Sequence, residues 1–204
     1  MTTWYILRHA EKAGGDFPNP RLPLPDEPLS PKGRQDAERL VPFFTGRPVA
    51  AIYVSAYQRT LQTVAPVARA LGLTPQADER LNEINNSGLV GLSEAEIRQK
   101  YPEVWKAYTE RTADFRFPGG ETGAEAQRRI ASFIEEVRPR HEQGDVLLVS
   151  HDGLIRLLAC HLLGLPVYRR WNFQVDFCGL MEIIWQPDRS EWKLVHFNQI
   201  VGHA

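Results

Sequence analysis

The sequence predicts an α/β fold, a three-layer α/β/α sandwich whose central sheet is mostly parallel and ends in an antiparallel hairpin. Short apolar runs of β-forming residues alternate with segments that carry helix-capping signals, an order typical of parallel strands joined by crossover helices. Only the turn 186–190 separates the last two predicted strands, 179–185 and 192–198, which predicts the hairpin. No linker, repeat or low-complexity tract interrupts the pattern, so we expect residues 1–204 to form a single domain.

Composition excludes several classes of protein. Hydrophobic residues make up 43% of the 204, enough for a sizeable core, and a formal net charge of -1 argues against a nucleic-acid partner. There is no apolar run of about 18 residues and no signal-peptide pattern, so we expect no membrane partner and a cytoplasmic location. The two cysteines, Cys160 and Cys178, indicate neither a disulfide framework nor a zinc site. A homodimer stays an open alternative to a monomer.

The first strand and the loop after it lie near the N-terminus. Residues 4–7 form a short apolar run, which predicts a strand buried on both faces. Five prolines within 12–28 exclude a helix or a central strand, so this segment is expected to be a stiff, extended surface loop. It either covers an edge of the domain or forms a rim over the site.

Helices and strands then alternate up to residue 77. They are a helix from Pro31 to about Phe44, a strand at 50–54, a helix at 57–71 and an edge strand at 73–77. Ser30 is placed to cap the first helix, with Pro31 at its first position. The pattern Ser55-x-x-Gln58 predicts a capping box at the start of the second helix, which puts Arg59 in its first turn.

The second half of the chain shows the same alternation. The predicted elements are helices at 93–101, 102–111 and 122–138, a strand at 145–150 and a helix ending at Leu163. The patterns Ser93-x-x-Glu96 and Thr122-x-x-Glu125 predict capping boxes. The strand at 145–150 is the most apolar of all and ends directly before His151.

Charged and imidazole side chains follow three of the predicted parallel strands. Arg8 and His9 end the first strand, Arg59 follows the second, and His151 with Asp152 follows the fourth. Such strand ends share one edge of a parallel sheet, so we expect these side chains to meet there. Two guanidinium groups with two imidazoles favour a phosphate-like dianion, whereas two fixed positive charges disfavour a divalent metal.

Five stretches resemble signatures of the histidine phosphatase superfamily, also called phosphoglycerate-mutase-like. In chain order they are Leu7-Arg8-His9-Ala10-Glu11, Leu29-Ser30-Pro31-Lys32-Gly33-Arg34-Gln35-Asp36-Ala37, Val54-Ser55-Ala56-Tyr57-Gln58-Arg59-Thr60, Pro118-Gly119-Gly120-Glu121-Thr122 and Val149-Ser150-His151-Asp152-Gly153. The first is similar to the L-R-H-G-E signature of that family. The five stretches occur in the family's order and span nearly the whole chain.

The resemblance implies hydrolysis of a small phosphoester through phosphohistidine. His9 is expected to be the nucleophile, while Arg8, Arg59 and His151 hold the phosphoryl oxygens. Glu83, at the family's L-x-E position, is expected to protonate the leaving oxygen and then to take a proton from the attacking water. No metal and no organic cofactor is implied.

Several alternatives stay open. Asp152 is the rival general acid, since one branch of the superfamily uses an aspartate after its second histidine; otherwise it caps the helix that starts at Gly153. Asp152 and Arg21 are further candidate substrate-binding residues, with Arg21 on the rim. A phosphoglycerate-type mutase is disfavoured because the segment between Glu83 and His151 is short. A non-catalytic module that binds phosphorylated ligands would keep the same anion pocket.

Overall fold

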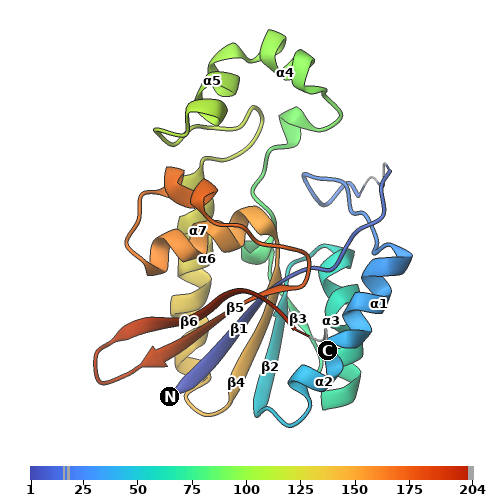
Figure 1. The fold of residues 1–204 in the computed structure, drawn as a ribbon, viewed down its shortest axis with the longest axis vertical. Coiled ribbons are helices and arrows are strands. Elements are labelled where there is room, and N and C mark those ends of the chain that lie inside the picture. The colour runs from blue at the N-terminus through green and yellow to red at the C-terminus, as the bar shows by residue number, and fades with distance from the viewer. Residues whose placement is uncertain (16, 18, 202–204) are drawn as a thin grey trace.

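The chain folds around one six-stranded sheet, shown in the computed structural model, which describes residues 1–15, 17 and 19–201 (Figure 1). The strands are β1 Thr2–Arg8, β2 Val49–Val54, β3 Gln76–Ala77, β4 Asp145–Ser150, β5 Gly179–Gln186 and β6 Glu191–Ile200. The α-helices are α1 Pro31–Arg39, α2 Val41–Phe44, α3 Gln58–Leu71, α4 Glu94–Lys100, α5 Pro102–Glu110, α6 Gly123–Val137 and α7 Asp152–Leu162. The 3₁₀ turns are η1 Glu79–Leu81, η2 Ser87–Leu89, η3 Arg138–Arg140 and η4 Val167–Asn172.

The strand order is β3-β2-β4-β1-β5-β6, and it confirms the predicted topology. β1, β2, β3 and β4 pair in parallel, whereas β5 runs antiparallel to β1 and forms the expected hairpin with β6. The three strands that precede the candidate site residues, β2, β4 and β1, are therefore neighbours at the middle of the sheet.

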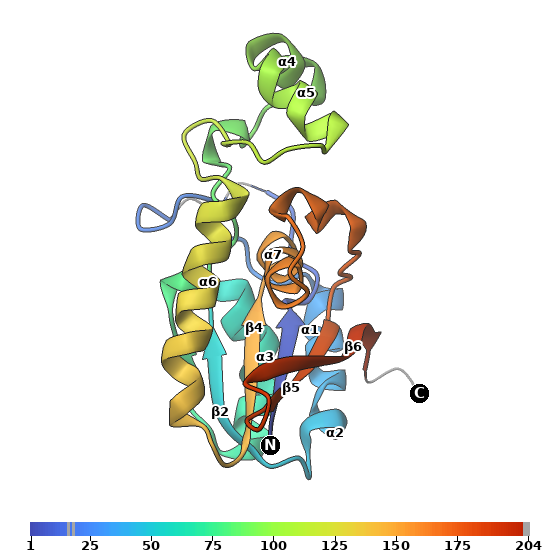
Figure 2. The same ribbon diagram turned by 90° about the vertical axis from the view of Figure 1, so that its left-hand side faces the viewer.

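Two helical layers cover the sheet, as predicted (Figures 1 and 2). α1, α2 and α3 lie on one face, and α6 and α7 lie on the other. Alternate residues of β1 enter different cores: Trp4 and Ile6 pack on the α6–α7 side, and Tyr5 and Leu7 pack on the side of α1 and α3. This burial on both faces explains why the parallel strands are continuous apolar runs.

Three predictions about local structure were wrong. The first helix ends at Arg39, and only the short α2 follows, because Pro42 lacks the N–H needed to continue a helix. The edge strand is only two residues long. The capping box at Ser55 is absent, since Tyr57 is the N-cap of α3 and makes no side-chain cap; the Gln58 N–H instead donates to Asp26 Oδ1 at 2.8 Å.

The other capping predictions were confirmed. Ser30 Oγ accepts from the Gly33 N–H at 2.9 Å, and both Ser93 and Thr122 form complete capping boxes. The helices α4 and α5 stand away from the sheet, beyond the carboxyl ends of the parallel strands (Figures 1 and 2). Within the described ranges, no helix is both long and apolar enough to cross a membrane.

Candidate active site

Strands β2, β4 and β1 end side by side, which brings the predicted site residues together. Arg8 pairs in register with Ser150, and Val54 pairs with Val149, so the three chain segments that leave the sheet start at the same level. The ring centroids of His9 and His151 are 5.1 Å apart. The prediction of a shared edge is therefore confirmed.

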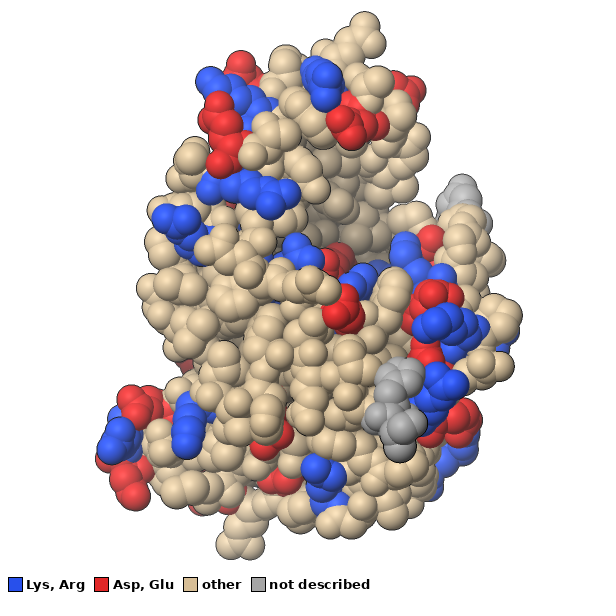
Figure 3. Space-filling model, in the orientation of Figure 1, with Lys and Arg blue, Asp and Glu red and all other residues tan. Residues whose placement is uncertain are grey.

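A cavity of about 740 Å³ opens at this edge, and we refer to it as the catalytic cavity. Its walls are the described residues Arg8, His9, Lys12, Gly15, Leu24, Pro25, Glu27, Arg59, Glu83, Asn86, Val90 and Gly91. In the space-filling view the surface is hollowed between the α4–α5 unit and the body of the molecule (Figure 3). The proline-rich segment supplies several of these residues, so it forms a rim over the site. An ion pair between Lys12 and Glu27 closes part of that rim.

His9 is held in one orientation by its own chain. Its ring is almost fully buried, and Nδ1 lies 2.8 Å from the carbonyl oxygen of Ala10. A carbonyl only accepts, so Nδ1 carries the proton of the neutral ring and Nε2 carries the lone pair. Burial, and then the positive charge of Arg59, lowers the pKa of His9 to about 3. The ring is therefore neutral over the physiological range.

Arg8 and Arg59 line the catalytic cavity beside His9. Arg8 Nη1 donates to the carbonyl of Val175 at 2.5 Å, and its guanidinium stacks on Phe177 with 4.1 Å between its carbon and the ring centroid. Within the described part of the chain, Arg8 Nε is buried without a hydrogen-bond partner. Burial lowers the pKa of both guanidinium groups, yet an arginine starts from so high a value that both stay charged.

His151 lies behind Arg59 and does not line the catalytic cavity. Arg59 Nε donates to His151 Nδ1 at 3.3 Å, so the neutral ring carries its proton on Nε2, which faces Ser55 Oγ at 2.8 Å. Burial, and then the charge of Arg59, holds the pKa of His151 well below its ordinary value. The pKa values of both histidines are therefore lowered, with burial as the larger cause and the charge of Arg59 as the next.

Glu83 is fixed by backbone N–H groups. Oε1 accepts from Ile84 at 2.8 Å and from Leu154 at 3.2 Å, and Oε2 accepts from Gly153 at 3.2 Å. These bonds favour the ionised carboxylate, but burial dominates and raises the pKa of Glu83. The carboxyl group therefore keeps its proton to a higher pH than an exposed glutamate does.

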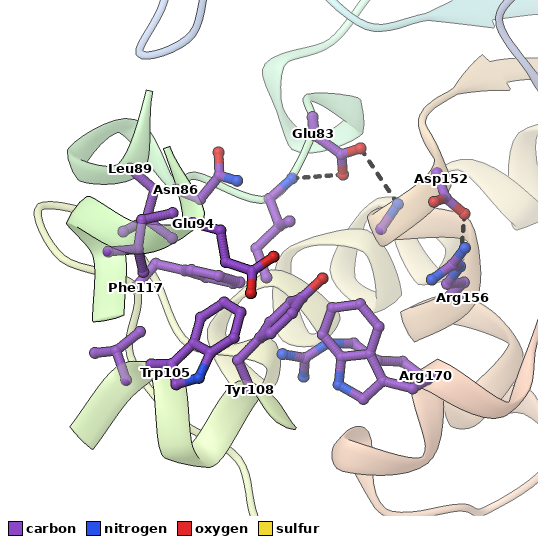
Figure 4. Close-up of a pocket in the computed structure, with 15 residues that line it drawn as sticks. Glu83, Asn86, Leu89, Glu94, Trp105, Tyr108, Phe117, Asp152, Arg156 and Arg170 are labelled. Atoms are coloured by element: carbon purple, nitrogen blue, oxygen red, sulfur yellow. Dashed lines mark hydrogen bonds and ion pairs between the residues drawn. The ribbon is translucent and has the colours of Figure 1, made fainter. Parts of the chain in front are cut away.

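A second cavity of about 510 Å³ adjoins the first, and Glu83 and Asn86 line both (Figure 4). We call it the aromatic cavity, because the side chains of Trp105, Tyr108, Phe117 and Trp171 form much of its wall. Glu83 thus lies at the boundary between a cationic chamber and an aromatic one.

Asp152 and Arg21 do not line the catalytic cavity. Asp152 lines the aromatic cavity, and its Oδ1 pairs with Arg156 Nε at 2.6 Å (Figure 4). The alternative prediction of an N-cap was wrong, because His151 holds that position and Asp152 is already helical. Arg21 is exposed and lines neither cavity.

Several residues of the site escaped the sequence analysis. Val175 and Phe177 position Arg8, Asp26 caps the helix that carries Arg59, and Arg170 and Trp171 in η4 line the aromatic cavity. These residues lie in segments without a helical or strand periodicity, so no pattern singled them out. Among the described residues, no group of three or more His, Cys, Asp or Glu could hold a metal ion.

Comparisons with known proteins agree on one family. The model of the histidine phosphatase superfamily (branch 1) matches residues 4–200. "Phosphoserine phosphatase 1" of Hydrogenobacter thermophilus is 33% identical over 176 residues, 86% of this chain and 83% of the relative. "Probable phosphoglycerate mutase GpmB" of Shigella dysenteriae is 29% identical over 162 residues, 79% of this chain and 75% of the relative.

The fold also matches solved structures. The mycobacterial glucosyl-3-phosphoglycerate phosphatase in complex with inorganic phosphate superposes with a TM-score of 0.83 at 23% identity, and the match covers 100% of both chains. This likeness extends the agreement in fold to the full length of the chain.

Proposed function

The chain belongs to the histidine phosphatase superfamily, branch 1, and we propose that it is a phosphatase that hydrolyses small phosphomonoesters through a phosphohistidine at His9. The observation that carries this proposal is the state of the His9 ring. Its Nδ1–H donates to the Ala10 carbonyl, and its Nε2 lone pair is available in a cavity lined by two guanidinium groups. A neutral nitrogen nucleophile beside fixed positive charge is what attack on a phosphate dianion needs.

In the first step, the Nε2 lone pair of His9 forms a bond to phosphorus while the bond to the leaving oxygen breaks. Protonated Glu83 gives its proton to that oxygen, so the alcohol departs neutral. In the second step a water oxygen attacks phosphorus, Glu83 takes the water proton, and the N–P bond breaks to restore neutral His9. Arg8 and Arg59 donate to the phosphoryl oxygens in both steps.

The position of Glu83 supports its role over that of Asp152. Glu83 lines both cavities, so a phosphoryl group beside His9 and a leaving group in the aromatic cavity would meet next to its carboxylate. Asp152 lines the aromatic cavity alone and is paired with Arg156. The burial that raises the pKa of Glu83 keeps a proton available at a higher pH than for an exposed carboxyl group.

While the cavity is empty, His151 positions Arg59, because its Nδ1 accepts a hydrogen bond from Arg59 Nε. The negative charge of a bound dianion offsets that of Arg59 and raises the pKa of His151. Nδ1 then takes up a proton and donates to a phosphoryl oxygen.

The test is phosphate release from a panel of alkyl and aryl phosphates by wild-type protein and His9→Ala. We expect turnover that disappears in the variant. A mutase is the second candidate, in view of the similarity to GpmB; rapid transfer between the two hydroxyls of a phosphoglycerate with negligible hydrolysis would favour it. Vanadate binding without turnover of any ester would favour a non-catalytic phospholigand-binding module.

The remaining expectations stay predictions. They are a single domain over 1–204, a cytoplasmic location, no nucleic-acid partner and substrate contacts by Arg21 and Asp152, and a homodimer stays an open alternative to a monomer. The two cysteines are free and buried, which supports a reducing compartment.

A further inference from the structure

The aromatic cavity has a wall built from two separate parts of the chain. Trp105 and Tyr108 lie on α5, with ring centroids 6.0 Å apart and planes tilted by 31°. Tyr108 then meets Trp171 of η4 edge to face, with centroids 5.1 Å apart. In Figure 4 the rings of Trp105 and Tyr108 lie side by side along one wall of the cavity. The aromatic surface therefore spans from the α4–α5 unit to the body of the molecule.

Polar groups accompany the rings. Glu94 of α4 lines the cavity, and its carboxylate lies near the rings of Trp105 and Tyr108 (Figure 4). Arg170 lies beneath Trp171, with 4.9 Å between its guanidinium carbon and the ring centroid, and it is almost fully buried. Its Nη1 pairs with Asp114, but in the described ranges its Nη2 is buried without a hydrogen-bond partner. The cavity thus offers flat apolar faces together with polar side chains, among them Glu94 as an acceptor beside the rings.

The size of this cavity exceeds what a small alcohol fills. About 510 Å³ falls within the range of pockets that enclose drug-sized ligands. The serine of phosphoserine is a three-carbon alcohol and would leave most of the aromatic wall uncovered. A planar heteroaromatic group would stack on the wall and use the Glu94 carboxylate at its edge.

We propose that the aromatic cavity binds the base of a nucleoside monophosphate, whose phosphate lies against His9 and whose sugar oxygen lies beside Glu83. This inference rests on the proposed phosphatase function and specifies its substrate class. Glu94 accepts from an amino or ring N–H of the base. A purely hydrocarbon aryl group would use the rings but not the Glu94 carboxylate.

The first experiment compares substrates that differ only by the base. kcat/KM is measured for AMP and CMP against ribose 5-phosphate, with phosphoserine as a further reference. Base–aromatic stacking predicts a value for the nucleotides roughly 10-fold or more above that for ribose 5-phosphate. Equal values, or a preference for phosphoserine, would overturn the inference.

The second experiment removes the rings. Trp105→Ala and Tyr108→Ala should lower kcat/KM for AMP roughly 10-fold while that for ribose 5-phosphate stays within about 2-fold. Trp105→Phe, which keeps an aromatic face, should recover most of the loss. Tyr101→Ala is the matched control, because Tyr101 joins α4 to α5 but does not line the cavity. Equal losses for both substrates would show a structural role and contradict the proposal.

Binding gives a readout that does not depend on turnover. Adenosine should quench the tryptophan fluorescence of the wild type, ribose should not, and Trp105→Ala should weaken the adenosine response. A chain that binds adenosine but hydrolyses no ester would contradict the phosphatase function alone. A chain that hydrolyses ribose 5-phosphate in a His9-dependent way but shows no effect of the base would contradict the nucleoside inference alone.

Discussion

The carboxylate of Glu83 lies against the backbone of Gly153, whose N–H donates to Oε2 at 3.2 Å. A Cβ at position 153 would lie 2.7 Å from Glu83 Oε1 and 2.9 Å from Ile84 Cγ2. The glycine two residues after His151 therefore makes room for the proposed general acid. The first turn of α7, which follows His151, thus holds the Glu83 carboxylate in place.

Gly153→Ala should displace Glu83 and lower kcat. A misplacement of about 1 Å can cost roughly 10²-fold in rate, and we expect a loss of 10- to 10²-fold with little change in the folded fraction. Gly14→Ala is the control, since a Cβ there meets nothing within 4 Å. Steady-state kinetics and circular dichroism measure both effects, and full activity in Gly153→Ala would contradict the assignment.

Glu83→Gln and Asp152→Asn separate the two candidate acids. Loss of a general acid should cost roughly 10² to 10⁴ in rate with an alkyl phosphate and much less with nitrophenyl phosphate, whose leaving group needs no proton. We expect this dependence on the leaving group in Glu83→Gln. If only Asp152→Asn shows it, Asp152 is the acid.

The two histidines make stability fall in acid. Burial and Arg59 lower the pKa of His9 from the ordinary 6.5 to about 3, so between these values the unfolded chain binds a proton that the folded chain does not. Stability is therefore fully present above pH 6.5 and declines as the pH falls toward 3. Urea unfolding at pH 7 and pH 5 should show a loss of about 2 kcal/mol from His9.

A His9→Asn variant should lack that part of the loss between pH 7 and pH 5. His151 contributes with the same sign, because its pKa is lowered too, so the pH dependence becomes shallower without vanishing. An unchanged pH dependence in His9→Asn would contradict the lowered pKa.

Vanadate or phosphate should stabilise the fold by binding the native state alone. At 100 times Kd the gain is about 2.7 kcal/mol, which raises Tm by roughly 5 to 11 °C for a chain of this size. Arg59→Gln should abolish the shift, whereas Arg69→Gln on the exposed face of α3 should keep it. The readout is differential scanning fluorimetry, and no shift with millimolar vanadate would count against the anion site.

The sequence predicted the site residues that lie at or just after the ends of the parallel strands. Arg8, His9, Arg59 and His151 each follow an apolar parallel strand within a few residues, and the topology of the sheet then brings them together. Glu83 does not directly follow an apolar parallel strand, and only the family resemblance singled it out.

The rest depends on contacts between segments far apart in sequence. Ser55 looked like a capping residue because local spacing cannot show that His151 faces its hydroxyl across the sheet edge. Arg170 and Trp171 lie in a 3₁₀ turn, whose short length gives no periodic signal. The aromatic cavity is visible only once α5 and η4 are placed beside each other.

The most direct test of the account is to trap the phosphoenzyme. Wild-type protein is mixed with a labelled aryl phosphate, quenched within milliseconds in alkali, digested and mapped by mass spectrometry. We predict one acid-labile, alkali-stable phosphoryl group on the peptide that contains His9, and none in His9→Ala. A phosphoryl group on another residue, or undiminished turnover by His9→Ala, would contradict the phosphohistidine mechanism.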